Sequence, residues 1–265
     1  MREVLYWRRQ QKLVYLDERA TPQFWDARWV AEGTPRPVNP RDEVVTVTPR
    51  YLDSGARVLE GGCGRGNKVR ALAASGFRSI GIDFAADTVA RATDTYPDLD
   101  IRVGDVRALQ FDAGYFDGYW SIGVIEHFWD GYEAIFAEAA RVLRAGGVFF
   151  LTAPWFSPLR QKKASQGDYP VVDFDTEPDD FYQFALSRSE VTANLLHHGF
   201  DVLSWKGLAA ELSLRQDVFR FRRQINWLLG SRGSIAKRLL RRAIVKSSQR
   251  YCGHSFLAVA RKRVA

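Results

Sequence analysis

The chain has 265 residues, of which 46% are hydrophobic and 26% charged, the balance of a globular protein with a large buried core. Cys63 and Cys252 are too few to form a disulfide framework, so we expect both to be packed side chains in a reducing compartment. No apolar run approaches the roughly 18 to 20 residues of a membrane span, and arginines stand where a signal peptide has its apolar stretch. These features predict a cytoplasmic protein.

The positive charge of the chain is concentrated in one segment. The formal net charge is +7, yet residues 211–250 contain eleven Lys or Arg against Glu211 and Asp217, a local net charge of +9. The remainder, with a net charge of −2, is therefore close to neutral. Only this segment could form an electrostatic surface for nucleic acid, phosphate or anionic lipid.

Short apolar runs alternate with helical patterns through the middle of the chain, which predicts successive βαβ units on a parallel sheet and an α/β fold. In chain order, strands are predicted over Arg57–Glu60, Ser79–Asp83, Ile101–Val103, Phe116–Ser121, Gly147–Thr152, Phe200–Trp205 and Ser255–Ala260. Helices are predicted through Val69, Leu72 and Ala73, near Ala85–Ala92, over Tyr132–Leu143 and over residues 187–198. The last of these opens with Ser187 and Glu190 at capping-box spacing and closes at Gly199.

Two segments fall outside this pattern. Residues 1–50, with Trp7, Trp25 and Trp29 among charged residues, are predicted to form a helical cap over the ligand-binding edge of the sheet. The main domain is then predicted over residues 51–265.

The second segment is an insertion at about residues 207–251, which interrupts the final strand pair. It is predicted to form two basic amphipathic helices, with apolar positions at Val218, Phe221, Ile225, Leu228, Ile235, Leu239, Ala243 and Ile244. These helices form either a pair with a solvated basic face or a functional surface for anionic lipid or another polyanion.

A glycine-rich loop follows the first predicted strand and opens a helix, as a nucleotide-like ligand requires. It reads Glu60-Gly61-Gly62-Cys63-Gly64-Arg65-Gly66-Asn67. The dinucleotide fingerprint G-x-G-x-x-G fails, because Asn67 or Val69 stands where its third glycine belongs, and no phosphate-binding G-K-[ST] follows.

The loop instead matches E/D-x-G-x-G-x-G through Glu60, Gly62, Gly64 and Gly66, and the sequence here resembles the class I S-adenosylmethionine-dependent methyltransferases. The resemblance extends to Asp83, to Gly104-Asp105-Val106, and to the runs over residues 116–128 and 141–147, which are similar to the ubiquinone and menaquinone biosynthesis subgroup. It covers roughly residues 55–155 and implies a Rossmann-like, doubly wound, seven-stranded, mostly parallel sheet with the last strand antiparallel. S-adenosylmethionine is the implied cofactor.

The resemblance also implies roles for single residues. Asp83 would hold both ribose hydroxyls, Asp105 and the amide of Val106 would bracket the adenine, and Ser121 joins the cofactor site. Glu60 can favour the ammonium of the ligand. Each acid has a plainer interpretation: a helix N-cap for Asp83, bonds to nearby amides for Glu60 and a turn for Asp105. Tyr119 and Trp120 either face the sulfonium or belong to the core.

His127, just past the fourth strand, is the candidate catalytic base, because a histidine has an ordinary pKa of about 6.5; a structural role is the alternative. Glu126 is a weaker candidate. His197, His198 and His254 have no partners at metal-ligand spacing, so no metal is expected. The acidic stretch Asp173–Asp180 is interpreted as a solvated loop.

The acceptor is inferred by elimination. No [DNS]-P-P-[FYW] turn follows the fourth strand and neither cysteine follows a proline, which argues against nucleic acid. A small-molecule, sugar or lipid-linked acceptor remains, with a pocket predicted from Trp25, Arg28, Trp155, Tyr169 and Tyr182. Peripheral contact with the inner membrane surface through residues 211–250, and a homo-oligomer, are compatible with the pattern.

Three functions are compatible with a glycine loop of this kind: a catalytic methyltransferase, a non-catalytic subunit or sensor that binds S-adenosylmethionine, and a nicotinamide oxidoreductase. The absence of the third glycine of G-x-G-x-x-G disfavours the oxidoreductase.

Overall fold

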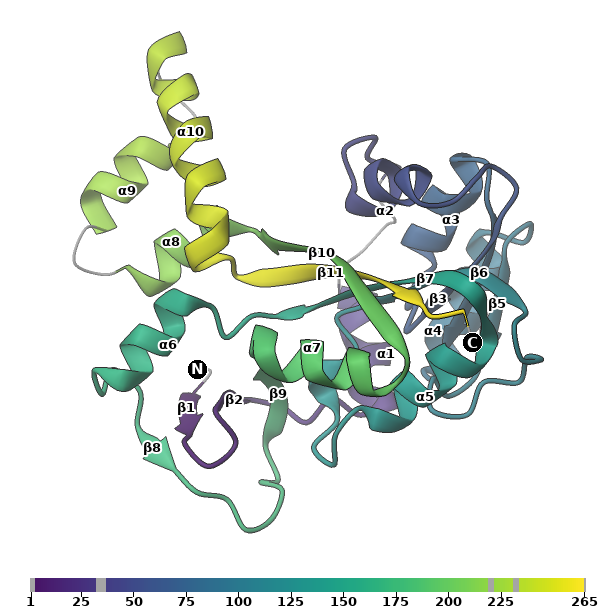
Figure 1. The fold of residues 1–265 in the computed structure, drawn as a ribbon, viewed down its shortest axis with the longest axis horizontal. Coiled ribbons are helices and arrows are strands. Elements are labelled where there is room, and N and C mark those ends of the chain that lie inside the picture. Colours follow the sequence, from purple (N-terminus) through teal and green to yellow (C-terminus); the bar gives the residue numbers. More distant parts are fainter. Residues whose placement is uncertain (1–2, 32–36, 219–221, 231–233, 265) are drawn as a thin grey trace.

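A seven-stranded sheet forms the centre of the protein (Figure 1), for which a computed structural model describes residues 3–31, 37–218, 222–230 and 234–264. The strand order is β10-β11-β7-β6-β3-β4-β5, and only β11 runs antiparallel to its neighbours. The strands are β3 (Arg57–Gly61), β4 (Arg78–Asp83), β5 (Asp100–Val103), β6 (Phe116–Ile122), β7 (Leu143–Pro154), β10 (Phe200–Leu208) and β11 (Ser255–Lys262). All seven predicted strands and the antiparallel last strand are confirmed.

Alternating side chains of the central strands divide the core into two layers. On β6 and β7, Tyr119 and Phe149 pack with α5 (Glu133–Val142) and α7 (Arg188–His197) on one face. Trp120 and Phe150, one position further along each strand, pack with α2 (Glu43–Val47) and α3 (Asn67–Ala74) on the other face. Because successive strand residues point to opposite faces, β6 and β7 are buried on both sides, as expected for the central strands of a doubly wound sheet.

Residues 3–16 correct the prediction of an all-helical N-terminal cap. A β-hairpin of β1 (Glu3–Trp7) and β2 (Lys12–Leu16) joins β8 (Val171–Val172) and β9 (Phe181–Ala185) in a second sheet of order β8-β1-β2-β9. The segment contains Val4, Tyr6, Trp7, Val14 and Tyr15, residue types that suit a pleated, half-buried surface. Its strand partners come from residues 171–185, so the local pattern did not show them.

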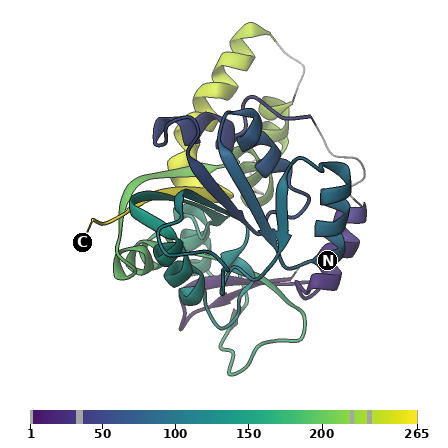
Figure 2. The same cartoon turned by 90° about the vertical axis from the view of Figure 1, so that its right-hand side faces the viewer.

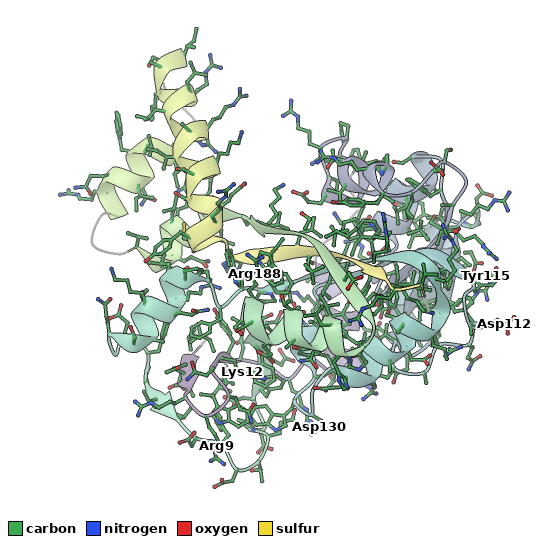
Figure 3. The ribbon with its side chains drawn as sticks, in the orientation of Figure 1. Arg9, Lys12, Asp112, Tyr115, Asp130 and Arg188 are labelled. Carbon is green, nitrogen blue, oxygen red and sulfur yellow. The ribbon has the colours of Figure 1, made fainter. Side chains whose placement is uncertain are left out.

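Contacts with the main domain hold this second sheet in place. The ring of Trp7 stacks on Trp129, with 4.9 Å between ring centroids and 15° between their planes. Lys12, labelled in Figure 3, forms an ion pair with Glu190 of α7 at 3.1 Å. The predicted division of the chain at residue 50 stays a prediction.

Helices do form in the rest of the N-terminal segment, at α1 (Pro22–Ala31) and α2, followed by the short helix η1 (Thr48–Arg50). Part of the acidic stretch after β8 pairs with this end of the chain, because Glu177 binds Arg19 at 2.6 Å.

The described residues of the insertion form three helices where two were predicted: α8 (Ala210–Asp217), α9 (Arg222–Leu229) and α10 (Ile235–Cys252). Phe221, one of the predicted apolar positions, lies outside the described residues. Figures 1 and 2 both show α10 projecting well beyond the body of the protein. Among the residues that the structure describes, none of the helices combines the length and the apolar character needed to span a bilayer.

A buried hydrogen bond ties the short helix η1 to the central sheet and generates a prediction. The indole Nε1 of Trp120 donates to Oγ1 of Thr48 at 3.0 Å, and this hydroxyl donates to the carbonyl of Val44 at 2.6 Å. Thr48→Val keeps the side-chain shape but leaves the indole N–H without an acceptor, which should lower the free energy of unfolding by about 1 to 3 kcal/mol.

Urea unfolding measures this loss. Thr46→Val is the matched control, because the hydroxyl of Thr46 is only partly buried and bonds the carbonyl of Asp42. Equal, small effects of the two substitutions would show that the buried bond does not stabilise the fold.

Candidate functional site

A pocket of about 290 Å³ lies at the carboxyl edge of the central sheet, where β3, β4 and β6 end. It brings together seven of the predicted site residues: Trp25, Glu60, Gly62, Asp83, Asp105, Val106 and His127. Its wall also includes Trp29, Phe84, Arg107 and Phe128, which sequence reasoning did not assign to a ligand. None of the described residues of the insertion lines this pocket.

The glycine loop turns sharply between β3 and α3. Gly62, Gly64 and Gly66 have φ values of +74°, +49° and +72°, a left-handed conformation that side chains rarely adopt. The amide of Gly64 donates to Oδ2 of Asp83 at 2.7 Å, and a Cβ atom at this glycine would lie 2.9 Å from the ring of Trp29. The loop therefore fits closely between the end of β4 and helix α1.

Asp83 ends β4 with its side chain 5% exposed. Oδ1 accepts the amide N–H of Ala85 at 2.9 Å, and Oδ2 accepts that of Gly64. Burial raises the pKa of Asp83, although these backbone hydrogen bonds oppose the shift. Each carboxylate oxygen has a second lone pair, so Asp83 can hold the loop and still accept bonds from two vicinal hydroxyls.

Glu60 supplies a second buried carboxyl on the pocket wall. Its side chain is 3% exposed, and Oε2 is buried without a hydrogen-bond partner. Burial raises the pKa of Glu60 well above its ordinary value, while the charge of Lys68 opposes this shift. An orphaned acceptor at a pocket wall fits a ligand that brings a hydrogen-bond donor, such as an ammonium group.

Asp105 follows β5 and is held in a charged turn. Its carboxylate accepts the amide of Arg107 at 2.8 Å and pairs with the guanidinium of the same residue at 2.6 Å, which keeps the pKa of Asp105 below its ordinary value. Arg107 in turn lies 5.1 Å from the ring centroid of Phe128. The predicted turn is thus present, and it places both Asp105 and Val106 on the pocket wall.

His127 ends the short helix η2 (Ile125–His127), and its ring is held in one orientation. Nδ1 lies 2.7 Å from the carbonyl oxygen of Tyr182 in β9. A carbonyl only accepts, so Nδ1 carries a proton, and Nε2 is the ring nitrogen that can act as a base. The rings of Trp25 and Tyr182 meet the imidazole edge-on at 5.2 and 5.1 Å. The structural and the basic interpretations of His127 are therefore compatible.

Glu126, next to His127, is not among the residues that line the pocket. Its side chain is buried, Oε2 has no partner, and desolvation raises the pKa of Glu126 to about 8. The carboxyl is therefore mostly neutral at pH 7 and does not line the pocket.

Helix α1 places two tryptophans on the pocket wall, and an aspartate of the same helix holds it in position. Trp25 and Trp29 stack with 5.8 Å between ring centroids and 26° between planes. Between them, Oδ1 of Asp26 accepts both the amide (2.7 Å) and the hydroxyl (2.6 Å) of Thr88 in α4 (Ala86–Thr95). Tryptophans four residues apart on a helix were a signal that both rings share one face.

Several predicted site residues lie elsewhere. Trp155 packs against Trp205 at 6.2 Å, and Tyr169 packs in the cluster of Leu13 and Phe156, so neither of these predicted acceptor-pocket residues lines this pocket. After β7 the chain leaves the pocket and follows β11 and the second sheet. Arg28 and Tyr182 do not line the pocket themselves but contact residues that do: Arg28 lies over the ring of Trp25, and Tyr182 holds His127.

Three further residues belong to the sheet. Ser121 is fully buried beneath the pocket, and its hydroxyl has no partner. Trp120 stacks on Phe150, and Tyr119 packs against Phe149, so both rings follow the core interpretation. Within the described part of the chain, no three His, Cys, Asp or Glu side chains are grouped to hold a metal ion.

Comparisons with known proteins agree with this geometry. The family profile described as methyltransferase domain matches residues 59–151. A probable S-adenosylmethionine-dependent methyltransferase of Mycolicibacterium smegmatis is 36% identical over 165 residues, which are 61% of this chain and 58% of that protein. The chain thus spans less than two thirds of that relative.

A ubiquinone biosynthesis O-methyltransferase of Xanthomonas oryzae is 33% identical over 207 residues, 76% of this chain and 86% of that protein. Phosphoethanolamine N-methyltransferase 2 of Haemonchus contortus, solved with S-adenosyl-L-methionine, has a TM-score of 0.55 over 92% of this chain and 58% of that chain, and its 18% identity shows a shared fold. The chain therefore belongs to the class I S-adenosylmethionine-dependent methyltransferases.

Proposed function

We propose that this methyltransferase transfers a methyl group to a hydroxyl on a flat, largely apolar small molecule, either free or lipid-linked. The observation that carries the proposal is the fixed ring of His127 on a pocket wall that also holds Trp25, Phe128 and Val124. Flat aromatic walls favour a flat acceptor, and a basic nitrogen favours an acceptor that must lose a proton.

The four acidic and amide groups of the site suit S-adenosylmethionine. Glu60 would bind its ammonium, Asp83 its ribose hydroxyls, and Asp105 with the amide of Val106 its adenine. The cofactor supplies a methyl group already activated by a sulfonium. The protein then has to align the nucleophile and exclude water, and proximity of this kind can supply about 7 to 11 kcal/mol of the barrier.

A hydroxyl nucleophile must be deprotonated during methyl transfer. With Nδ1 protonated and bonded to Tyr182, Nε2 of His127 is the atom that would take the proton. Glu126 is a poorer candidate, because it is buried and outside the pocket. The relative named as a ubiquinone biosynthesis O-methyltransferase supports oxygen as the nucleophile.

An adjoining groove offers the acceptor a way in. This groove of about 490 Å³ shares Ala20, Arg107, His127 and Phe128 with the cofactor pocket and continues to Trp129 and Phe181. An acceptor in the groove would therefore contact His127, which lines both spaces. A non-catalytic binding role is not favoured, because such a role needs neither the groove nor a basic nitrogen between the two spaces.

The function and the base are tested together. The protein is incubated with methyl-labelled S-adenosylmethionine and a panel of phenols, enols and amines, and we expect the label on a hydroxyl. His127→Ala should lower turnover by about 100-fold or more, while cofactor affinity stays nearly constant. His127→Asn separates the two roles, because an asparagine can donate to Tyr182 but accepts no proton. Recovery of turnover in His127→Asn, or label only on amines or carbon, would contradict the proposal.

The ribose assignment predicts that Asp83→Ala weakens cofactor binding by roughly 10- to 100-fold, since hydrogen bonds to an ionised acceptor contribute about 1.5 to 3 kcal/mol. Isothermal titration with S-adenosylhomocysteine measures the change. Asp87→Ala, an exposed aspartate in the first turn of α4, is the control and should bind normally. Unchanged affinity in a natively folded Asp83→Ala protein would show that the assignment is wrong.

The ammonium assignment predicts a pH dependence. Burial raises the pKa of Glu60, so this carboxyl is neutral in acid and becomes a better partner for an ammonium as the pH rises. Affinity for S-adenosylhomocysteine should therefore increase with pH by up to about tenfold per unit until Glu60 is ionised, and Glu60→Gln should remove the increase.

Methylthioadenosine, which lacks the amino acid part, serves as the control ligand. Its affinity should be the same in the parent protein and in Glu60→Gln. A pH profile for S-adenosylhomocysteine that Glu60→Gln leaves intact would place the ammonium on another residue.

A further inference from the structure

The projecting helices of the insertion expose large apolar side chains that no part of the methyltransferase site explains. Trp227 of α9 is 66% exposed, and Ile235, Leu239 and Leu240 at the start of α10 are 68%, 58% and 50% exposed. Six of the protein's thirteen exposed large hydrophobic residues among those described lie within residues 210–252. Apolar exposure of this density marks a contact surface.

Cationic side chains lie between these apolar ones. Along α10, Ile235, Arg238, Leu239, Arg242 and Lys246 follow one another at spacings that place them on one stripe of the helix. We call these five residues the docking surface. They line a groove of about 670 Å³, and Figure 3 shows nitrogen-tipped side chains extending from α9 and α10 into solvent.

The two acids of the segment do not neutralise this surface. Glu211 of α8 is taken up by the guanidinium of Arg241, with bonds of 2.7 and 2.8 Å. Asp217 is taken up by Arg160 of α6 (Pro158–Ser165), at 3.1 Å. Arg238, Arg242 and Lys246 are all exposed. The docking surface therefore carries an excess of positive charge.

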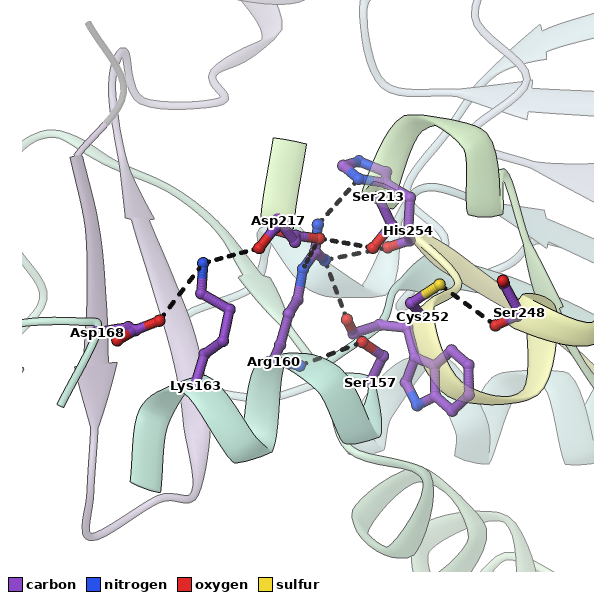
Figure 4. Close-up of polar contacts among 10 residues, drawn as sticks. Ser157, Arg160, Lys163, Asp168, Ser213, Asp217, Ser248, Cys252 and His254 are labelled. Atoms are coloured by element: carbon purple, nitrogen blue, oxygen red, sulfur yellow. Dashed lines mark hydrogen bonds and ion pairs between the residues drawn. The ribbon is translucent and has the colours of Figure 1, made fainter. Parts of the chain in front are cut away.

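A buried network fixes the base of the insertion to the main domain (Figure 4). Arg160, 2% exposed, donates to the carbonyl oxygen of Trp155 (3.0 Å) and to Nδ1 of His254 (2.9 Å) as well as to Asp217. The insertion leaves the sheet at Leu208, which pairs with Ser255 at the carboxyl end of β7. The docking surface is thus anchored at the same edge of the sheet as the cofactor pocket.

We propose that the docking surface binds an anionic phospholipid membrane. Arg238, Arg242 and Lys246 would contact lipid phosphates, while Ile235 and Leu239 enter the apolar part of the interface. Only a partner that combines negative charge with an apolar layer matches both kinds of side chain.

Other partners satisfy only part of this pattern. A nucleic acid would pair with the cations but leave the exposed aliphatic side chains in water. A second copy would bring two surfaces of like charge together, which repel each other. An anionic membrane also places the pocket edge near lipid-linked molecules, although the docking does not depend on the identity of the acceptor.

Co-sedimentation of the full chain with vesicles tests the proposal, with no cofactor or acceptor present so that the result is independent of methyl transfer. Binding to phosphatidylglycerol-containing vesicles should exceed binding to pure phosphatidylcholine by at least about tenfold and should fall steeply between about 50 and 500 mM salt. Arg238→Glu with Arg242→Glu should reduce it by about 100-fold or more. Ile235→Ser with Leu239→Ser should also weaken it, at both salt concentrations.

Arg78→Glu with Arg261→Glu is the matched control, because it makes the same change of charge at exposed positions on the opposite edge of the sheet, and it should retain binding. Circular dichroism and unfolding midpoints check that each variant folds. Three outcomes would overturn the proposal: equal and negligible pelleting in every condition, binding to an oligonucleotide but not to vesicles, or a dimer in light scattering that Ile235→Ser with Leu239→Ser dissociates while vesicle binding is absent.

Discussion

The carboxylate of Asp83 is the interaction on which the site depends most. It accepts one backbone hydrogen bond from the glycine loop at Gly64 and another from Ala85 before α4, so it joins the ends of two neighbouring strands. The left-handed glycines let the loop come close enough for this bond. Without the carboxylate, two buried amides would lose their acceptor, and the floor of the pocket would lose its shape.

The same pocket concentrates groups whose burial is unfavourable in the absence of a ligand. Glu60 has an orphaned oxygen, and burial raises the pKa of both Glu60 and Asp83. An unfavourable free energy of burying polar groups is typical of binding sites, where these groups are directed at a ligand. Other parts of the fold then supply the stability. The tightly packed layers on both faces of β6 and β7 are the evident source of that stability here.

Two additions to the common fold meet the carboxyl edge of the sheet and serve different purposes. Helix α1 lines the pocket with Trp25 and Trp29, and Asp26 binds it to α4. The insertion lines none of the pocket with its described residues and projects away from the body. One addition forms part of the pocket wall, whereas the other presents a charged and apolar surface to the surroundings.

The sequence by itself determined the seven central strands, the glycine loop and the buried acids Glu60 and Asp83, because these features follow from local alternation and from short, regular spacing. Only the tertiary structure decided the second sheet, in which β1 and β2 find partners some 170 residues later, and the bond from His127 to Tyr182, 55 positions away. The tertiary structure also places Trp155 and Tyr169 outside the pocket lining. The residues that follow a strand in the sequence do not show in which direction the chain continues. A local sequence pattern indicates on which face of its own helix or strand a side chain lies. Contacts between distant segments depend instead on how whole helices and strands pack together.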